Sequence, residues 1–138
     1  MRFSTFSVCA ALCVLLACGA FVQGQKRKDP CQSGITSDLV DCSLKELAKA
    51  DAELNKVYKQ LMSLIGKDES EATWKVKLKA AQQAWIKYRD ANCEYEAEYS
   101  GGGSAYTFEY NFCLAGMTTA RAQELQKMID QIKARDGQ

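Results

Sequence analysis

Residues 40–65 read VDCSLKELAKADAELNKVYKQLMSLI, and the spacing of their apolar side chains decides the fold class. Apolar or aromatic residues recur at alternating steps of four and three, with Asp51 as the single interruption: Val40, Leu44, Leu47, Leu54, Tyr58, Leu61 and Ile65. This period places them on one face of a helix. We therefore expect an amphipathic helix of about seven turns. Thr36 or Ser37 can cap its start, and Gly66 ends it.

A second long helix is expected after Gly66. Asp68 followed by Glu71 has the spacing of a capping box, with Asp in place of the usual Ser or Thr. A second stripe then follows at helical spacing: Trp74, Leu78, Ala81, Trp85, Tyr88, Asn92, Tyr95 and Tyr99. Residues 75–79 alternate like a strand, but they lie inside this longer helical pattern, so length favours the helix.

Three consecutive glycines interrupt the helical pattern at residues 101–103. Each glycine costs a helix roughly 1 kcal/mol relative to alanine, so we expect a loop from about residue 100 to residue 115. A third helix would then be capped by Thr118 or Thr119 and carry a last stripe: Met117, Arg121, Leu125, Met128 and Ile132. The sequence therefore predicts an all-α domain over residues 37–136, with a long antiparallel helical hairpin and a third helix.

The first 24 residues predict an export signal. Arg2 is followed by a short apolar stretch, which is typical of a secretory signal peptide. Cleavage after Gly24 would release a periplasmic or secreted chain with a flexible segment at residues 25–36. Residues 15–18 also resemble a lipobox, so an envelope lipoprotein anchored through Cys18 is the alternative. This anchor is the only membrane attachment that we expect.

Four cysteines follow the signal segment: Cys31, Cys42, Cys93 and Cys113. An even number in an exported chain predicts two disulfides. If the hairpin turns near residues 66–68, Cys42 and Cys93 lie level and could bond to each other. Local pairing of Cys31 with Cys42 and of Cys93 with Cys113 is the alternative. A zinc site is not expected, because the chain has no histidine and no C-x-x-C pair.

The same hairpin geometry places Asp51 one turn from Arg89. A carboxylate in an apolar stripe needs a cation, so we expect an Asp51–Arg89 ion pair, with Arg121 as the competing partner of Asp51. Aromatic and amide side chains at the neighbouring positions have expected structural roles. Core packing is expected for Tyr58, Trp85 and Tyr88, and bridging between helices for Asn55 and Gln82.

Composition argues against catalysis and nucleic-acid binding. Without histidine there is no imidazole base, and all four cysteines are expected to be oxidised. The acidic residues Asp90, Glu94 and Glu98 share a helical face that is typical of solvated surface. After residue 24 the basic and acidic residues balance at 17 each, so nothing favours a nucleic-acid partner. We expect a protein that is not an enzyme and that needs no cofactor.

Several motifs together resemble a known family. They are Cys42, Ala50-Asp51-x-x-Leu54-Asn55-x-x-Tyr58, Leu78-x-x-x-Gln82-x-Ala84-Trp85-Ile86-x-Tyr88-Arg89-Asp90-Ala91-x-Cys93, Gly102-Gly103-Ser104, Cys113 and Thr118-x-x-Arg121-x-x-x-Leu125. Over roughly residues 31–125 the chain resembles the lysozyme inhibitor LprI-like N-terminal domain family of bacterial envelope and secreted proteins. The resemblance implies a protein partner, lysozyme, and it favours the local disulfide pairing.

The expected function is therefore that of an exported binding protein that inhibits lysozyme. The alternative is a structural or stress-related envelope module that binds peptidoglycan or another envelope protein. The candidate contact is the glycine-rich loop, which carries small and aromatic residues: Gly102, Gly103, Ser104, Tyr106 and Phe108. These aromatics could instead cover the open end of the bundle. A net charge of zero would deprive an inhibitor of long-range attraction to basic lysozymes. The sequence does not indicate an oligomeric state.

Overall fold

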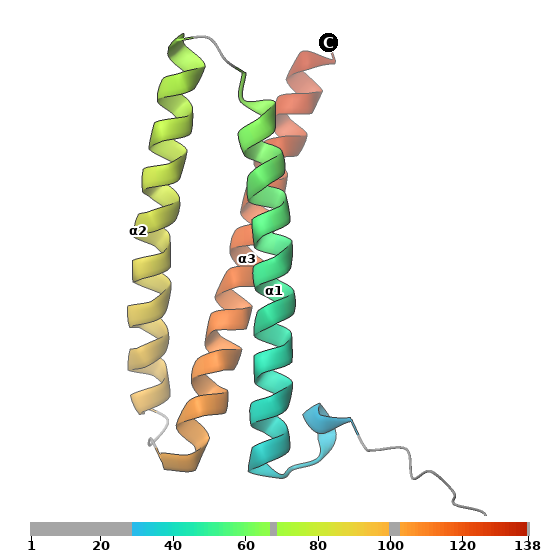
Figure 1. The fold of residues 1–138 in the computed structure, drawn as a ribbon, viewed down its shortest axis with the longest axis vertical. Helices are drawn as coiled ribbons and strands as arrows, with labels where there is room; N and C mark the ends of the chain where they lie inside the picture. Colours follow the sequence, from blue (N-terminus) through green and yellow to red (C-terminus); the bar gives the residue numbers. More distant parts are fainter. Residues whose placement is uncertain (1–28, 67–68, 100–102, 138) are drawn as a thin grey trace, which may run out of the picture.

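The structure is a computed structural model that describes residues 29–66, 69–99 and 103–137. A short 3₁₀ turn, η1 (Pro30–Gln32), precedes three helices: α1 (Thr36–Leu64), α2 (Glu69–Tyr99) and α3 (Gly103–Asp136). Successive helices run in opposite directions (Figure 1). The predicted all-α class is confirmed, since no strand occurs in the described ranges. None of the described helices has an apolar stretch long enough to span a membrane. The predicted signal segment, Cys18 and Asp68 lie outside the described residues.

The first helix has nearly the bounds that its apolar stripe predicts. It starts at Thr36 and ends at Leu64, where the N–H of Ile65 donates to the carbonyl of Leu61 at 3.1 Å. The predicted cap is wrong, because Ile35 occupies the N-cap position and no side chain caps the helix. Leu54, Leu61 and Ile65 of the predicted stripe are buried, whereas Leu44 is half exposed.

The third helix begins much earlier than predicted. Residues 103–115 were expected to form a loop, but α3 starts at Gly103, which takes a positive φ of 66°. The buried face of α3 continues at helical spacing through this region, yet it includes polar residues that hide the pattern: Asn111, Leu114, Thr118, Ala122, Leu125 and Ile129. Gly116 lies within the helix, and its cost of roughly 1 kcal/mol is too small to end it.

The core lies between α1 and α3. Its buried residues come from these two helices: Leu54, Val57, Leu61, Ile65, Ala122, Leu125 and Ile129. Leu78 and Trp85 of α2 pack against its edge. Helix α3 packs along α1 and, less extensively, against α2, while α1 and α2 hardly touch each other. Figure 1 shows α2 standing apart from α1, with α3 linking the two.

Helix α2 turns a different face to the core than predicted. Tyr88 was expected in the core, but 61% of its surface is exposed, and Tyr95 and Tyr99 of the same stripe are exposed as well. The buried positions of α2 are instead Cys93 and Ala97, together with Gln82. Polar and covalent links to α3, described below, hold this face inward, so they rather than the aromatic stripe determine the rotation of α2.

Both disulfides follow the local pairing. Cys31 is bonded to Cys42, which ties η1 to α1, and Cys93 is bonded to Cys113, which ties α2 to α3. The alternative Cys42–Cys93 bond is wrong, because α3 rather than α1 is the neighbour of α2. The second disulfide lies close to the α2–α3 junction, so it fixes the relative position of these helix ends.

Candidate functional site

The side chain of Arg89 joins all three helices. From α2, its Nη1 donates to Thr118 Oγ1 of α3 at 2.9 Å and lies 3.4 Å from Asp51 Oδ1 of α1. Its Nε donates to Asp90 Oδ1 at 2.9 Å. The predicted Asp51–Arg89 ion pair is therefore present. The expectation of a buried carboxylate is wrong, because the Asp51 side chain is 47% exposed and Arg89 is the buried member, at 14%.

The competing cation, Arg121, serves a second link between α2 and α3. Its Nε donates to Gln82 Oε1 at 3.1 Å, and its Nη1 lies 2.8 Å from Glu124 Oε2. The guanidinium carbons of Arg89 and Arg121 lie 5.4 and 5.8 Å from the centroid of the Trp85 ring. Gln82 thus bridges helices as predicted, and Trp85 is half-buried against the core with two cations over its ring.

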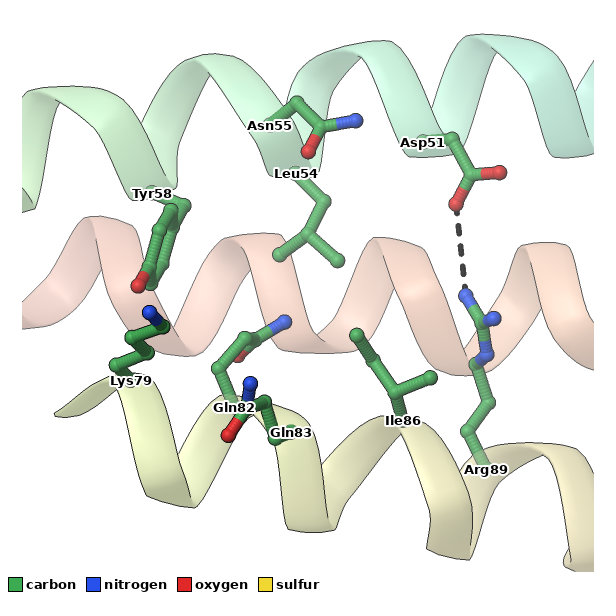
Figure 2. Close-up of a pocket in the computed structure, with 9 residues that line it drawn as sticks. All are labelled: Asp51, Leu54, Asn55, Tyr58, Lys79, Gln82, Gln83, Ile86 and Arg89. Atoms are coloured by element: carbon green, nitrogen blue, oxygen red, sulfur yellow. Dashed lines mark hydrogen bonds and ion pairs between the residues drawn. The ribbon is translucent and has the colours of Figure 1, made fainter. Parts of the chain in front are cut away.

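A groove with a volume of about 410 Å³ lies between α1 and α2. Figure 2 shows the facing side chains of the two helices with α3 behind them. The lining residues are Asp51, Leu54, Asn55, Tyr58, Lys79, Gln82, Gln83, Ile86 and Arg89. Most of them belong to the motifs that carry the family resemblance. Asn55, expected to bridge helices, is exposed and lines this groove.

The chemistry of the groove suits binding. It offers the amides of Asn55 and Gln83 and the amine of Lys79, with Leu54 and Ile86 as apolar surface. Asp51 is the single carboxylate among the lining residues, so the groove does not present the pair of carboxylates that hydrolysis of a glycosidic bond requires. No group of three or more side chains suited to a metal ion lies in the described ranges.

A second cavity, lined mainly by apolar side chains, lies nearer the α1–α2 turn and also borders α3. Its volume is about 370 Å³, and its lining is Leu61, Leu64, Ile65, Trp74, Leu78, Met128, Ile132 and Arg135. Leu78 of this cavity directly precedes Lys79 of the groove, so the two hollows lie near each other along α2.

The end of the molecule at the α2–α3 junction is rich in aromatic side chains. Tyr95 and Tyr99 stack with ring centroids 6.4 Å apart, and Tyr106 and Tyr110 stack at 5.9 Å. Tyr99 is 84% exposed, whereas Tyr106 and Phe108 are half-buried. We call this end the tip, and define it as residues 94–99 and 103–110. Of the predicted contact loop, Gly103, Tyr106 and Phe108 lie in the first turns of α3, Gly102 lies outside the described residues, and the Ser104 side chain is not described.

Charge is distributed unevenly between the two halves of the domain. Residues 29–55 and 80–120, which include the tip, contain 11 acidic and 4 basic residues. Residues 56–79 and 121–138 contain 6 acidic and 10 basic residues. The acidic residues affect a neighbouring tyrosine. Burial raises the pKa of Tyr110, and the charges of Asp90 and Glu94 raise it further. The balanced total charge thus conceals an acidic half and a basic half.

The family model described as Lysozyme inhibitor LprI matches residues 28–125. The chain belongs to this family. The matched range contains both disulfides, the groove and the tip. A relative in Rhizobium meliloti (strain 1021), named "Uncharacterized protein R02472", is 33% identical over 129 residues, covering 87% of this chain and 93% of the relative. No solved structure matches the chain significantly. The family description names an inhibitor, which agrees with the expectation of a protein that is not an enzyme.

Sequence reasoning missed the polar residues buried against α3. Asn111 Nδ2 donates to Ser43 Oγ at 3.2 Å, and both side chains are buried between α1 and α3. Thr118, expected to cap a helix, lies fully buried inside α3 as the acceptor for Arg89. The available signal was the motif Thr118-x-x-Arg121, whose spacing places both residues on one helical face.

Proposed function

We propose that this protein is an exported inhibitor of lysozyme-type muramidases and that it contacts the enzyme with its acidic, aromatic tip. Membership in the lysozyme inhibitor family carries the proposal, since the matched residues 28–125 include the whole tip. Export is supported by the two disulfides, which persist in oxidising compartments such as the periplasm or the extracellular space.

The shape of the tip supports its role as the contact surface. The catalytic site of a lysozyme is a concave cleft, and a narrow end formed by two helices can enter such a cleft, whereas the α1–α2 groove is itself concave. The exposed ring of Tyr99 offers the kind of aromatic anchor that dominates many protein interfaces.

The charge of the tip supports the same assignment. The tip segments contain four carboxylates, Glu94, Glu96, Glu98 and Glu109, and no lysine or arginine. A local negative field attracts a basic lysozyme at long range even where the total charge of the chain is balanced. A net charge of zero predicts no long-range attraction to a basic lysozyme, but the uneven distribution of charge provides that attraction at the tip.

The Cys93–Cys113 disulfide prepares the tip for binding. It holds α2 and α3 together close to their junction, so the aromatic pairs on the two helices keep their positions without a partner. Such rigidity reduces the entropy that is lost when a complex forms.

Substitution of Tyr99 tests this assignment. Tyr99→Ala should weaken lysozyme inhibition at least about tenfold, because an exposed aromatic anchor is lost while the core is unchanged. Tyr88→Ala is the matched control, since Tyr88 is also an exposed tyrosine of α2 but lies about three turns from Tyr99 and outside the tip. Inhibition of cell-wall lysis is measured with the oxidised protein lacking residues 1–24.

A substitution that fills the groove tests whether the tip or the groove is the surface that contacts lysozyme. Asn55→Trp places a large side chain at the exposed edge of the groove and should leave inhibition unchanged. Loss of inhibition in Asn55→Trp together with full inhibition by Tyr99→Ala would assign the contact to the groove and overturn our proposal. Retention of the protein by insoluble cell wall, without any effect on lysozyme, would support the alternative of an envelope module.

A further inference from the structure

Helix α2 exposes an apolar face that the fold leaves without a partner. Six of the ten large apolar or aromatic side chains exposed by the described residues lie on this helix. Among them, Trp74, Tyr88 and Tyr95 are 48%, 61% and 69% exposed. The alanines between them, Ala81, Ala84 and Ala91, are exposed as well.

These residues form one continuous line along the helix. Steps of three and four connect eight positions, which we call the α2 seam: Trp74, Lys77, Ala81, Ala84, Tyr88, Ala91, Tyr95 and Glu98. This is the spacing by which one helix packs along another in a coiled coil. Gln82, Arg89 and Cys93, which link α2 to α3, lie roughly 140° around the helix from the middle of the seam at 100° per residue. Apart from Trp74, which lines the second cavity, the seam therefore faces away from α3 and from the groove.

We propose that the α2 seam pairs with the same seam of a second copy of this chain, in antiparallel orientation. This inference goes beyond the proposed function and does not depend on it. The charges along α2 favour a second copy as the partner. Within the seam, Lys77 lies near the start and Glu98 lies at the end.

Antiparallel pairing brings these opposite charges together. Lys77 of each copy then lies within about one turn of Glu98 of the other, and unlike charges across an interface stabilise the pairing. Parallel pairing would instead place Lys77 beside Lys77 and Glu98 beside Glu98. An antiparallel pair also has a two-fold axis, which is the symmetry of most homodimers, and it closes without forming a chain of copies.

The sizes of the side chains agree with one register of this pairing. If the two-fold axis passes level with residue 86, Ala84 lies opposite Tyr88 of the second copy, and Ala81 lies opposite Ala91. A large ring thus meets a small methyl group, which allows two helices to approach closely and interdigitate. Lys77 then lies opposite Tyr95 of the second copy, where its amine can rest on the ring face.

The pairing covers part of the tip, because Tyr95 and Glu98 belong to both the seam and the tip, whereas Tyr99, Tyr106 and Glu109 lie outside the seam. The two tips lie toward opposite ends of the dimer, with the two Tyr99 positions about 39 Å apart along the helix axes when the two-fold axis is level with residue 86. A single pair of helices buries a modest area, so we expect association at micromolar rather than nanomolar concentration.

Light scattering or sedimentation across a concentration series tests the inference in the absence of lysozyme. The oxidised protein should shift from one to two chains per particle as its concentration rises. Ala84→Glu places a carboxylate in each copy at the centre of the seam and should keep the protein monomeric. Ala72→Glu is the matched control, because Ala72 is an exposed alanine of α2 outside the seam, and it should dimerise like the unchanged protein. Circular dichroism checks that both variants remain helical.

Cysteine cross-linking tests the orientation. An equimolar mixture of Ala81→Cys and Ala91→Cys proteins, distinguished by a size tag, should form disulfides mainly between the two different variants. Cross-linking of Ala81→Cys to itself would indicate parallel pairing and overturn the inference. A protein that stays monomeric at all concentrations would overturn it as well, as would equal dimerisation of Ala84→Glu and the unchanged protein.

Discussion

At the scale of single residues, a largely buried cation, Arg89, links the three helices. Arg89 contributes contacts to α1, to α3 and to its own helix, and only 14% of its side chain is exposed. A buried charge is tolerated when hydrogen bonds and counter-charges satisfy it, and here Asp51, Asp90 and Thr118 do so. Thr118 is fully buried, so the removal of Arg89 also removes a hydrogen-bond partner from a buried hydroxyl.

Replacement of Arg89 should therefore destabilise the fold. We expect Arg89→Met to lower the free energy of unfolding by about 1–3 kcal/mol, because the links to Thr118 and Asp51 are lost together. Lys56→Met is the control: Lys56 forms an exposed ion pair with Glu53, which contributes no more than about 0.5 kcal/mol. Chemical denaturation measures both. Equal losses in the two variants would contradict the role given to Arg89.

Tyr110 should make stability depend on alkaline pH. Burial and the nearby carboxylates raise its pKa above the usual value of 10.0. The fold favours the neutral form of Tyr110. Its contribution to the free energy of unfolding is therefore complete below the pKa of Tyr110 in the unfolded chain, and it is lost as the pH rises through the pKa in the folded protein. We expect Tyr110→Phe to lose less stability than the unchanged protein above pH 10. Chemical denaturation below and above pH 10 measures the free energy of unfolding of both proteins. Identical pH profiles of the two would contradict the role given to Tyr110.

Some site residues could be predicted from the sequence and others could not. The Asp51–Arg89 pair followed from the expected turn near residues 66–68, since it requires only that α1 and α2 run antiparallel. The link from Arg89 to Thr118 depends on where α3 lies. The motif Thr118-x-x-Arg121 places Thr118 on the same helical face as Arg121, but it does not indicate which residue of α2 that face meets.

At the scale of the helices, polar contacts explain both errors in the prediction. Asn111 and Thr118 are buried because Ser43 and Arg89 satisfy them, so the inward face of α3 does not look apolar in the sequence. The aromatic stripe of α2 looks like a core face, but Gln82, Arg89 and Cys93 have partners on α3 and turn that helix by about a third of a turn. Specific partners thus outweigh the apolar pattern in both helices.

The two disulfides should contribute differently to the helices. Chain-entropy arguments give each about 3 kcal/mol, because they close loops of 20 and 11 residues. Beyond this, Cys93–Cys113 holds α2, which has no extensive contact with α1, whereas Cys31–Cys42 holds only η1. Replacing Cys93 and Cys113 by Ser should therefore increase amide hydrogen exchange over residues 90–99, while the same change at Cys31 and Cys42 should not. Equal rates of amide hydrogen exchange over residues 90–99 in the two variants would contradict this difference.

At the scale of the whole molecule, separation of charge reconciles a balanced composition with an inhibitory role. The acidic half carries the tip, and the basic half carries the α1–α2 turn and the end of α3. Surface charges interact over about 10 Å at 0.1 M salt, so the approach of a basic enzyme to the tip should be sensitive to ionic strength. Total charge alone would have hidden this property, because it sums over both halves.

The measurement that tests the central claim most directly is a titration of the oxidised protein into lysozymes of several classes, at low and high salt, with cell-wall lysis as the readout. We predict saturable inhibition of at least one class at one tip per enzyme, slower association at high salt, and loss of inhibition when the disulfides are reduced. Full lysozyme activity in every class at saturating protein would contradict the inhibitory function.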